Sequence, residues 1–236
     1  MPNKTDSGKV KEYFNQWNVY QKVIKFNYMV HHEIFEVLHQ FFDANFHQPF
    51  SLLDLGCGDA FHIARLLKDT KIAHYCGVDL SKVALSYANK NMDSISCEKV
   101  FIEGNLMEVV RDFQAKFDVI IAGYSMHHLT LAEKDAFFGY CCAALKSGGQ
   151  FLAYDIARHH HETREAFLKR NWDYKKNNWT EMTPEELVLH HDHTFANDYP
   201  ESLDTLDELA KLNGFRHLKS LFKDNNELYE LCCFST

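Results

Sequence analysis

Residues 51–60, with the sequence SLLDLGCGDA, constrain the fold of this chain more than any other stretch. The apolar run contains one acid, Asp54, and is followed by Gly56 and Gly58, after which a helical pattern begins near Ala60. This order predicts a strand, a tight glycine turn and a helix. In an open α/β sheet, such a unit binds a ligand at the carboxyl end of its strand, because glycine lets the backbone come close and the helix start offers free N–H groups.

Strand-like and helical patterns alternate up to residue 156, and this spacing predicts a parallel sheet with helices on both faces. Thr130 and Glu133 form a capping box that starts one of the helices, which we expect to end at Gly148-Gly149. Two further strands near the end are close enough in sequence to form an antiparallel hairpin. The expected strands are residues 52–55, 74–80, 99–103, 117–122, 151–156, 215–221 and 228–234.

The composition argues against several classes of protein. The 236 residues carry a formal net charge of -8 and a pI near 6.0, so no overall basic field is available to hold a nucleic acid. No uncharged apolar run reaches about 18 residues, and residues 1–11 are polar and charged, so we expect neither a membrane span nor a secretory signal. The seven cysteines include no C-x-x-C pair and are expected to be free thiols. These features together predict a cytoplasmic protein.

Two features near the glycine turn indicate the kind of ligand. Phe61 stands where the dinucleotide-binding fingerprint has a third glycine, and its bulk argues against a pyrophosphate at the turn. Asp79 ends the next expected strand, about 20 residues after the turn, where a carboxylate can accept two hydrogen bonds from a ribose diol. A ligand with a ribose and without phosphates fits both features.

Five motifs, in this order, resemble those of class I S-adenosylmethionine-dependent methyltransferases. They are LLDLGCGDA at 52–60, GVDLS at 77–81, EGNL at 103–106, FDVII at 117–121 and LKSGG at 145–149. Residues 215–234 are similar to the closing hairpin of that family, in which the last strand runs antiparallel. The resemblance implies an α/β, Rossmann-like fold with a seven-stranded, mostly parallel sheet and an antiparallel last strand. It also implies S-adenosylmethionine as the cofactor, with S-adenosylhomocysteine as its product.

The resemblance assigns residues to the cofactor site. Asp54 and the two turn glycines would surround the methionine portion, and Asp79 would hold the ribose hydroxyls. Asn105 would stand near adenine, where its amide oxygen can accept a hydrogen bond, although the family often has an aspartate there. Ala60 replaces a third glycine that the family often has, and Asp118 is expected to be structural. The predicted cofactor-binding residues are Asp54, Gly56, Cys57, Gly58, Asp79, Leu80, Asn105, Leu106, Gly123 and Tyr20.

Residues 123–129 follow the fourth expected strand, where the transferred methyl group should point. They lack the Asn/Asp-Pro-Pro-aromatic stretch of nucleobase amino-methyltransferases and look like the same loop in many small-molecule methyltransferases. We take His127 and Tyr124 as candidate catalytic or acceptor-contacting residues, with helix capping or packing as the alternative for His127. The histidine clusters at 159–161 and 190–193 lack metal-binding helical spacing, so no metal is predicted, and they could instead line the acceptor pocket.

The domain organisation follows from these assignments. Residues 1–48 are expected to form an N-terminal helical lid, residues 49–236 the methyltransferase domain, and residues 158–198 an insertion that covers the acceptor pocket. We expect methyl transfer to a small-molecule acceptor by in-line displacement, in a monomer or homodimer. Two alternatives remain open: a sensor or partner subunit that binds the cofactor without turnover, and a protein or RNA methyltransferase, which would require an open, charged cleft.

Overall fold

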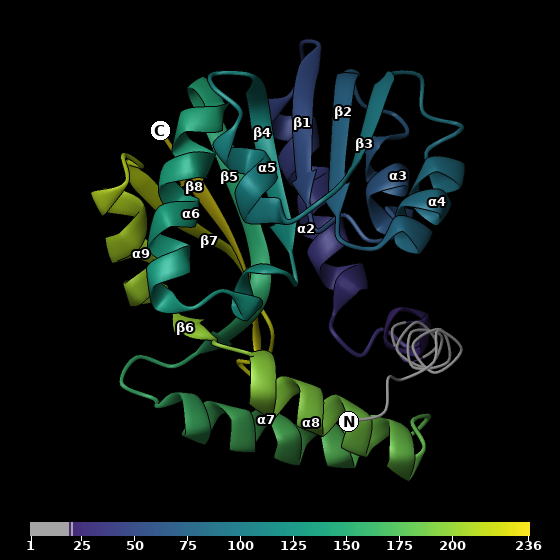
Figure 1. Cartoon of the computed structure of the whole chain (residues 1–236), viewed down its shortest axis with the longest axis vertical. Helices are drawn as coiled ribbons and strands as arrows, with labels where there is room; N and C mark the ends of the chain where they lie inside the picture. Colours follow the sequence, from purple (N-terminus) through teal and green to yellow (C-terminus); the bar gives the residue numbers. More distant parts are fainter. Residues whose placement is uncertain (1–18, 20) are drawn as a thin grey trace, which may run out of the picture.

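The computed structural model describes residue 19 and residues 21–236, which form an α/β fold around one sheet (Figure 1). Seven strands follow the spatial order β3-β2-β1-β4-β5-β8-β7, and the short β6 pairs with β5 beside this path. The strands are β1 (Phe50–Leu55), β2 (Ile72–Asp79), β3 (Glu98–Glu103), β4 (Phe117–Gly123), β5 (Leu145–Arg158), β6 (Glu201–Ser202), β7 (His217–Lys223) and β8 (Tyr229–Ser235). The helices are α2 (His31–Asn45), α3 (Phe61–Leu67), α4 (Lys82–Asn91), α5 (Leu106–Arg111), the 3-10 turn η1 (Met126–His128), α6 (Leu131–Ala144), α7 (Arg164–Asn178), α8 (Pro184–Asn197) and α9 (Leu203–Leu212).

The sheet is parallel except at one strand. β1 pairs in parallel with both β2 and β4, whereas β8 runs antiparallel to both β5 and β7. The predicted fold class, with its antiparallel last strand, is thereby confirmed. The strand order reverses between β1 and β4, and open α/β sheets bind ligands outside the carboxyl ends of the strands at such a reversal.

Two apolar cores lie on opposite faces of the sheet. Leu52 and Val119 face a core that includes residues of α2, α3 and α4, whereas Leu53 and Ile120 face a core with residues of α5, α6 and α9 (Figure 1). Successive side chains of a strand point to opposite faces, so each central strand contributes to both cores. All six residues of β1 are buried for this reason, as expected of a parallel sheet covered on both sides.

The junction between α6 and β5 differs from the sequence-based prediction. Thr130 and Glu133 do form the predicted capping box. The expectation that the helix continues to Gly148-Gly149 was wrong, because Leu145 already has an extended backbone, with φ -75° and ψ 144°. Leu145 pairs with the first residue of β4, so the sheet ends the helix before the two glycines are reached.

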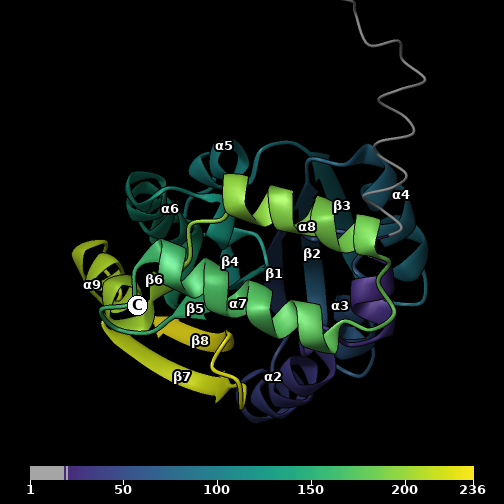
Figure 2. The ribbon, with the colours of Figure 1, turned by 90° about the horizontal axis from the view of Figure 1, so that it is seen from below.

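The segment predicted as an insertion, residues 158–198, contains α7 and α8. Both helices lie side by side across the carboxyl ends of the strands (Figure 1 and Figure 2). Thr183 and Glu186 form a second capping box, with Pro184 in the first turn of α8. Thr194 is the buried residue of α8, so this helix lies at the surface with one face toward the sheet edge.

The described part of the N-terminal segment divides into two portions. α2 packs on the sheet through Ile34, Leu38 and Phe42, which are all buried. Tyr28 precedes it and stacks on Trp179, next to α7, with ring centroids 5.0 Å apart and an interplanar angle of 7°. The lid role of residues 1–48 stays a prediction, and the helical pattern near residues 10–17 lies outside the described residues. No helix within residues 21–236 is both long and apolar enough to cross a membrane.

Candidate functional site

The glycine turn after β1 has the backbone conformation that its sequence predicts. Gly56 has φ +77° and Gly58 has φ +53°, values that residues with a Cβ rarely adopt. A Cβ on Gly56 would also lie 2.8 Å from the Cβ of Ser125, which follows β4. Ala60, which stands where the resemblance expects a third glycine, also has a positive φ, +52°. Its backbone conformation is therefore strained. The turn therefore packs directly against the end of β4.

Asp79 joins the ends of β1 and β2. Its Oδ2 accepts a hydrogen bond of 2.9 Å from the backbone N–H of Gly58, and its Oδ1 accepts one of 2.8 Å from that of Ser81. The side chain is partly exposed, and each carboxylate oxygen can accept a second hydrogen bond. The carboxylate can thus hold the turn and still accept hydrogen bonds from a ligand.

A first cavity of about 460 Å³ opens at this edge of the sheet. Among the residues that line it are nine predicted to bind the cofactor: Asp54, Gly56, Cys57, Gly58, Asp79, Leu80, Asn105, Leu106 and Gly123. The tenth, Tyr20, lies outside the described residues. A volume of this size is within the range of about 300–1,000 Å³ that small-molecule and cofactor sites occupy.

Asp54 lies at the base of this cavity and is 2% exposed. Its Oδ2 accepts a hydrogen bond of 2.8 Å from the hydroxyl of Tyr75, which is also buried. Burial raises the pKa of Asp54 to about 7. The acid of the glycine-turn motif is therefore only partly ionised near neutral pH, and no local sequence pattern identifies Tyr75 as its partner.

The rim of the first cavity is apolar on one side. Phe61 and Leu80 line it while being 40% and 72% exposed. Asn105 caps α5, and its amide oxygen accepts a hydrogen bond of 2.8 Å from the backbone N–H of Met107. That oxygen keeps one further lone pair for a ligand. The rim can therefore hold a flat ring between apolar side chains and one polar group.

Two histidines, His31 of the N-terminal segment and His62 of α3, also line the first cavity. The rings of His31 and His62 stack with centroids 5.2 Å apart. Burial lowers the pKa of His31 to about 3 and that of His62 to about 4, so both are neutral at pH 7. Within the described residues, one ring nitrogen of each has no hydrogen-bond partner. Both of these nitrogen atoms are buried in this structure.

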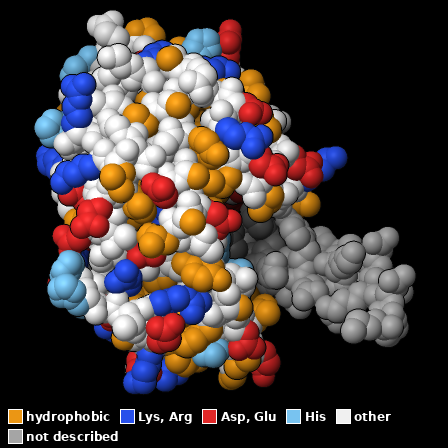
Figure 3. Space-filling view, turned by 60° about the vertical axis from the view of Figure 1, so that its left-hand side comes forward, with side chains coloured by type: hydrophobic (Ala, Val, Ile, Leu, Met, Phe, Trp, Pro, Cys, Tyr) orange, Lys and Arg blue, Asp and Glu red, His pale blue; other side chains and the backbone are white. Residues whose placement is uncertain are grey.

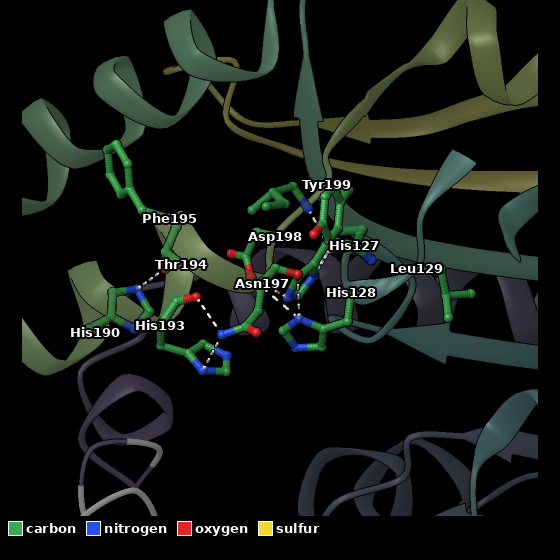
Figure 4. Close-up of polar contacts among 12 residues, drawn as sticks. His127, His128, Leu129, His190, His193, Thr194, Phe195, Asn197, Asp198 and Tyr199 are labelled. Atoms are coloured by element: carbon green, nitrogen blue, oxygen red, sulfur yellow. Dashed lines mark hydrogen bonds and ion pairs between the residues drawn. The ribbon is translucent and has the colours of Figure 1, made fainter. Parts of the chain in front are cut away.

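A second cavity, of about 270 Å³, adjoins the first, and Tyr124, His31 and His128 line both. Its walls come from the segment before α2, from the residues after β4, and from α7 and α8. Apolar side chains line one part: Val19, Val23, Met29, Ile156 and Leu189. Polar side chains line the other, several of them labelled in Figure 4: His127, Lys175, His190, His193, Thr194 and Asp198.

His127 is held at this cavity by Asp155 of β5. Nδ1 of His127 lies 2.5 Å from Oδ1 of Asp155, and the backbone N–H of His127 donates to Oδ2 at 2.9 Å. Burial alone would lower the pKa of His127, but the carboxylates of Asp155 and Asp198 raise it overall. The side chain is fixed in one orientation, with its other ring nitrogen, Nε2, toward Asp198.

Tyr124 forms part of the wall between the two cavities. Its φ is +48°, and its hydroxyl donates a hydrogen bond to the backbone carbonyl of Met29. Burial, with the nearby tyrosines and acids, raises its pKa well above the usual value for a phenol. Tyr124 therefore stays protonated at neutral pH, and its proton is already engaged with the N-terminal segment.

The two histidine clusters lie in different surroundings. Ring nitrogens of His159 and His160 lie 2.7 Å and 2.6 Å from carboxylate oxygens of Glu227 and Asp204, away from both of these cavities. His190 and His193 line the second cavity, as the sequence analysis allowed.

Asp118 is confirmed as structural. Its carboxylate accepts hydrogen bonds from the backbone N–H and hydroxyl of Ser51 and from the ammonium group of Lys146. These contacts lie at the start of β1, at the opposite end of that strand from the glycine turn.

Comparison with known sequences agrees with the motif resemblance. Residues 52–149 match a family model described as a methyltransferase domain. The uncharacterized protein RP789 of Rickettsia prowazekii is 28% identical over 105 residues, which is 44% of this chain and 19% of that protein. The chain thus spans only about a fifth of the length of this relative.

Solved structures of low sequence identity share the fold. A SAM-dependent methyltransferase from Archaeoglobus fulgidus is 12% identical, with a TM-score of 0.62 over 87% of this chain and 94% of that one. The 1,6-didemethyltoxoflavin-N1-methyltransferase of Burkholderia thailandensis, solved with 1,6-didemethyltoxoflavin and S-adenosylhomocysteine, is 13% identical, with a TM-score of 0.59 over 100% and 92%. The cyclopropane synthase MmaA2 of Mycobacterium tuberculosis is 17% identical, with a TM-score of 0.58 over 80% and 62%.

Proposed function

We propose, from the premise that this chain is a class I S-adenosylmethionine-dependent methyltransferase, that it methylates a small molecule held in the second cavity. The observation that carries the proposal is the wall that the two cavities share, formed by Tyr124, His31 and His128. A cofactor in the first cavity and an acceptor in the second would meet at this wall, as an in-line displacement requires.

The chemistry of the first cavity suits the cofactor. When bound, S-adenosylmethionine supplies a sulfonium methyl group to a nucleophile and leaves as S-adenosylhomocysteine. Asp79 would accept hydrogen bonds from the ribose hydroxyls, and Asp54 would face the positively charged methionine portion. The exposed side chains of Phe61 and Leu80 would cover the adenine ring.

The second cavity favours a small acceptor with an apolar body and a polar end. A volume of about 270 Å³ lies near the lower end of the range for small-molecule sites, and the cavity wall is apolar toward Met29 and Ile156 and polar toward His127 and Asp198. The similar methyltransferase of Burkholderia thailandensis was solved with a small heterocyclic compound.

His127 and Tyr124 are the proposed acceptor-side residues. Asp155 orients His127 so that Nε2 is directed to the polar end of the second cavity. Tyr124 cannot act as a base at neutral pH because its pKa is raised, so its proposed role is to position the acceptor through its ring. Alignment and exclusion of water supply most of what a methyl transfer needs, because the electrophile is already activated.

An RNA or protein acceptor is less well supported. On the face shown in Figure 3, basic side chains are interspersed with acidic ones and do not gather into one patch. The formal net charge of -8 opposes binding to a polyanion. We therefore propose a small molecule, and no nucleic acid, as the partner. We also propose that the chain binds no membrane, is located in the cytoplasm and is a monomer or homodimer.

Two measurements test the proposed function. Calorimetry should detect S-adenosylhomocysteine binding to the purified chain. A chain that binds no S-adenosylhomocysteine would overturn its assignment as an S-adenosylmethionine-dependent methyltransferase. Mass spectrometry should then detect a methylated product when S-adenosylmethionine is supplied with small amines, phenols, heterocycles and thiols. Cofactor binding without any product from this screen would favour the alternative of a sensor or partner subunit.

A further inference from the structure

A buried carboxylate oxygen of Asp198 lies near two histidine rings at the polar end of the second cavity. Asp198 is 5% exposed, and its Oδ1 has no hydrogen-bond partner within the described residues. This oxygen lies 3.8 Å from Nε2 of His127 and 3.3 Å from Nδ1 of His128. The three side chains gather where η1 meets the end of α8 (Figure 4), and their donor atoms all lie within 4.8 Å of one another.

The hydrogen bonds of Asp155 determine which nitrogen of His127 carries a hydrogen. Both oxygens of Asp155 accept backbone hydrogen bonds, from Ile156 and His127, and Oδ1 also lies 2.5 Å from Nδ1 of His127. Because an ionised carboxylate can only accept, Nδ1 carries the hydrogen. In the neutral ring, Nε2 then directs a lone pair toward Asp198. Either a proton on Nε2 or a metal ion between the two atoms would make this contact favourable.

Two of the distances among the three donor atoms are close to those of a metal site. Zinc binds imidazole nitrogen and carboxylate oxygen at about 2.0–2.2 Å, so neighbouring donors of a tetrahedral site lie about 3.3–3.6 Å apart. The distances from Asp198 to His128 and His127, 3.3 Å and 3.8 Å, are close to this range. Asp155 stands behind His127 as carboxylates commonly do behind metal-binding histidines. Nδ1 of His128 is also 3.4 Å from the carbonyl of Asn197, a long contact that a metal would replace.

Buried acids and buried ammonium groups surround the cluster. Asp155 and Asp198 are buried acids, and the buried Lys175 donates to Nε2 of His190 at 2.8 Å. The buried Lys134 also interacts with Asp155, so two ammonium groups lie near the two acids. The buried Oδ1 of Asp198 is still the acceptor that a further positive charge at Nε2 of His127, a proton or a metal ion, would face.

We propose that His127, His128 and Asp198 bind one divalent transition-metal ion, best matched by zinc, with an open position toward the acceptor. Two imidazoles and a carboxylate leave such a position in catalytic zinc sites. The role of the ion rests on the proposed function: the acceptor is a small molecule whose oxygen, nitrogen or sulfur binds the metal. The ion lowers the pKa of that group, which releases its proton to water and attacks as the nucleophile. The histidine clusters that prompted the expectation of no metal contribute none of these ligands.

The test uses the full chain after treatment with a chelator. Elemental analysis after Zn²⁺ loading and gel filtration should find one zinc per chain. Co²⁺ loading should give the visible absorption of a tetrahedral site. Asp198→Asn should weaken Zn²⁺ binding by at least about tenfold, and Asp155→Asn by about 10–100-fold. His128 is 41% exposed, so His128→Gln provides a ligand variant that should fold even if a buried variant does not.

The control is another histidine–aspartate pair on the surface. His160 pairs with Asp204 at 2.6 Å, and Asp204→Asn should leave Zn²⁺ binding unchanged. Equal Zn²⁺ binding by all variants would show adventitious binding to surface histidines and would overturn the metal site. A wild-type chain that retains less than one zinc after gel filtration would overturn it as well. S-adenosylhomocysteine binding, measured on the same protein samples, reports separately on the proposed function, because Asp198 does not line the first cavity.

Discussion

The hydroxyl of Tyr75 donates a hydrogen bond of 2.8 Å to Oδ2 of Asp54, at the base of the first cavity. Both side chains are buried, and burial raises the pKa of Asp54 to about 7. The acid of the glycine-turn motif therefore changes its charge near neutral pH. This property links the stability of the fold to the binding of a charged cofactor.

Asp54 should make the stability of the chain depend on pH. An unfolded aspartate has a pKa of about 3.9, so between about pH 4 and pH 7 the folded state binds this proton more tightly. The stabilisation is fully present below pH 4 and is lost as the pH rises through 7. Between pH 5 and pH 8, the free energy of unfolding of the wild type should fall by about 2 kcal/mol more than that of Asp54→Asn. Urea denaturation checks this, and parallel pH curves for the two proteins would contradict it.

The same proton should compete with S-adenosylmethionine. A positively charged cofactor beside Asp54 favours the ionised carboxylate, so binding should release a proton. The affinity for S-adenosylmethionine should rise by up to about tenfold between pH 6 and pH 8. Calorimetry in two buffers of different ionisation enthalpy measures the released proton. In Asp54→Asn, the affinity should not depend on pH and binding should release no proton. An unchanged proton release in this variant would mean that another group loses the proton.

Asp79 should be the residue with the largest effect on cofactor affinity. Asp79→Ala removes the proposed ribose acceptor and also the acceptor for the N–H groups of Gly58 and Ser81. We expect S-adenosylhomocysteine binding to weaken by at least about tenfold, because charge-assisted hydrogen bonds are lost. Asp118→Ala is the matched control, since it also removes an acid that accepts a backbone hydrogen bond, yet lies at the start of β4. Equal weakening in both variants would indicate a loss of stability and no direct contact.

Gly123 should tolerate no side chain. A Cβ at this position would lie 2.0 Å from Cζ of Tyr154, so Gly123→Ala should lower the free energy of unfolding by about 1–3 kcal/mol. The control is Gly148→Ala, where φ is +76° but no atom lies within 4 Å of the added Cβ. Thermal or urea unfolding should show the larger loss for Gly123→Ala. The reverse order would mean that Tyr154 can move aside easily.

The sequence predicted those parts of the molecule that short-range patterns determine. The glycine turn, the capping box of α6 and Asp79 at the end of β2 each follow from a few neighbouring residues. The end of α6 was missed because pairing with β4 at Leu145 outweighs the local helical pattern. This effect depends on pairing within the sheet, so a short stretch of sequence does not reveal it.

The partners within the site could not be predicted in the same way. Tyr75 reaches Asp54 from a neighbouring strand, and Asp198 reaches His127 from the end of α8, about 70 residues further along the chain. No periodicity marks either pair, because each is created by tertiary packing across elements. His127 itself was identified from its place after the fourth strand, whereas its contact with Asp155 became visible only in the structure.

His127 should affect turnover without affecting cofactor binding. It lines the second cavity and not the first, and Asp155 fixes its ring toward the acceptor side. We expect His127→Gln to lower kcat by about 100-fold or more, whether Nε2 serves the acceptor directly or through a metal ion. The dissociation constant of S-adenosylhomocysteine should stay unchanged. His193→Gln, in the same cavity but with the side-chain amide of Asn197 at its ring in place of a hydrogen-bonded carboxylate, should have a much smaller effect on kcat. Similar losses in both variants would mean that His127 only lines the cavity, and its assignment as an acceptor-side residue would then be wrong.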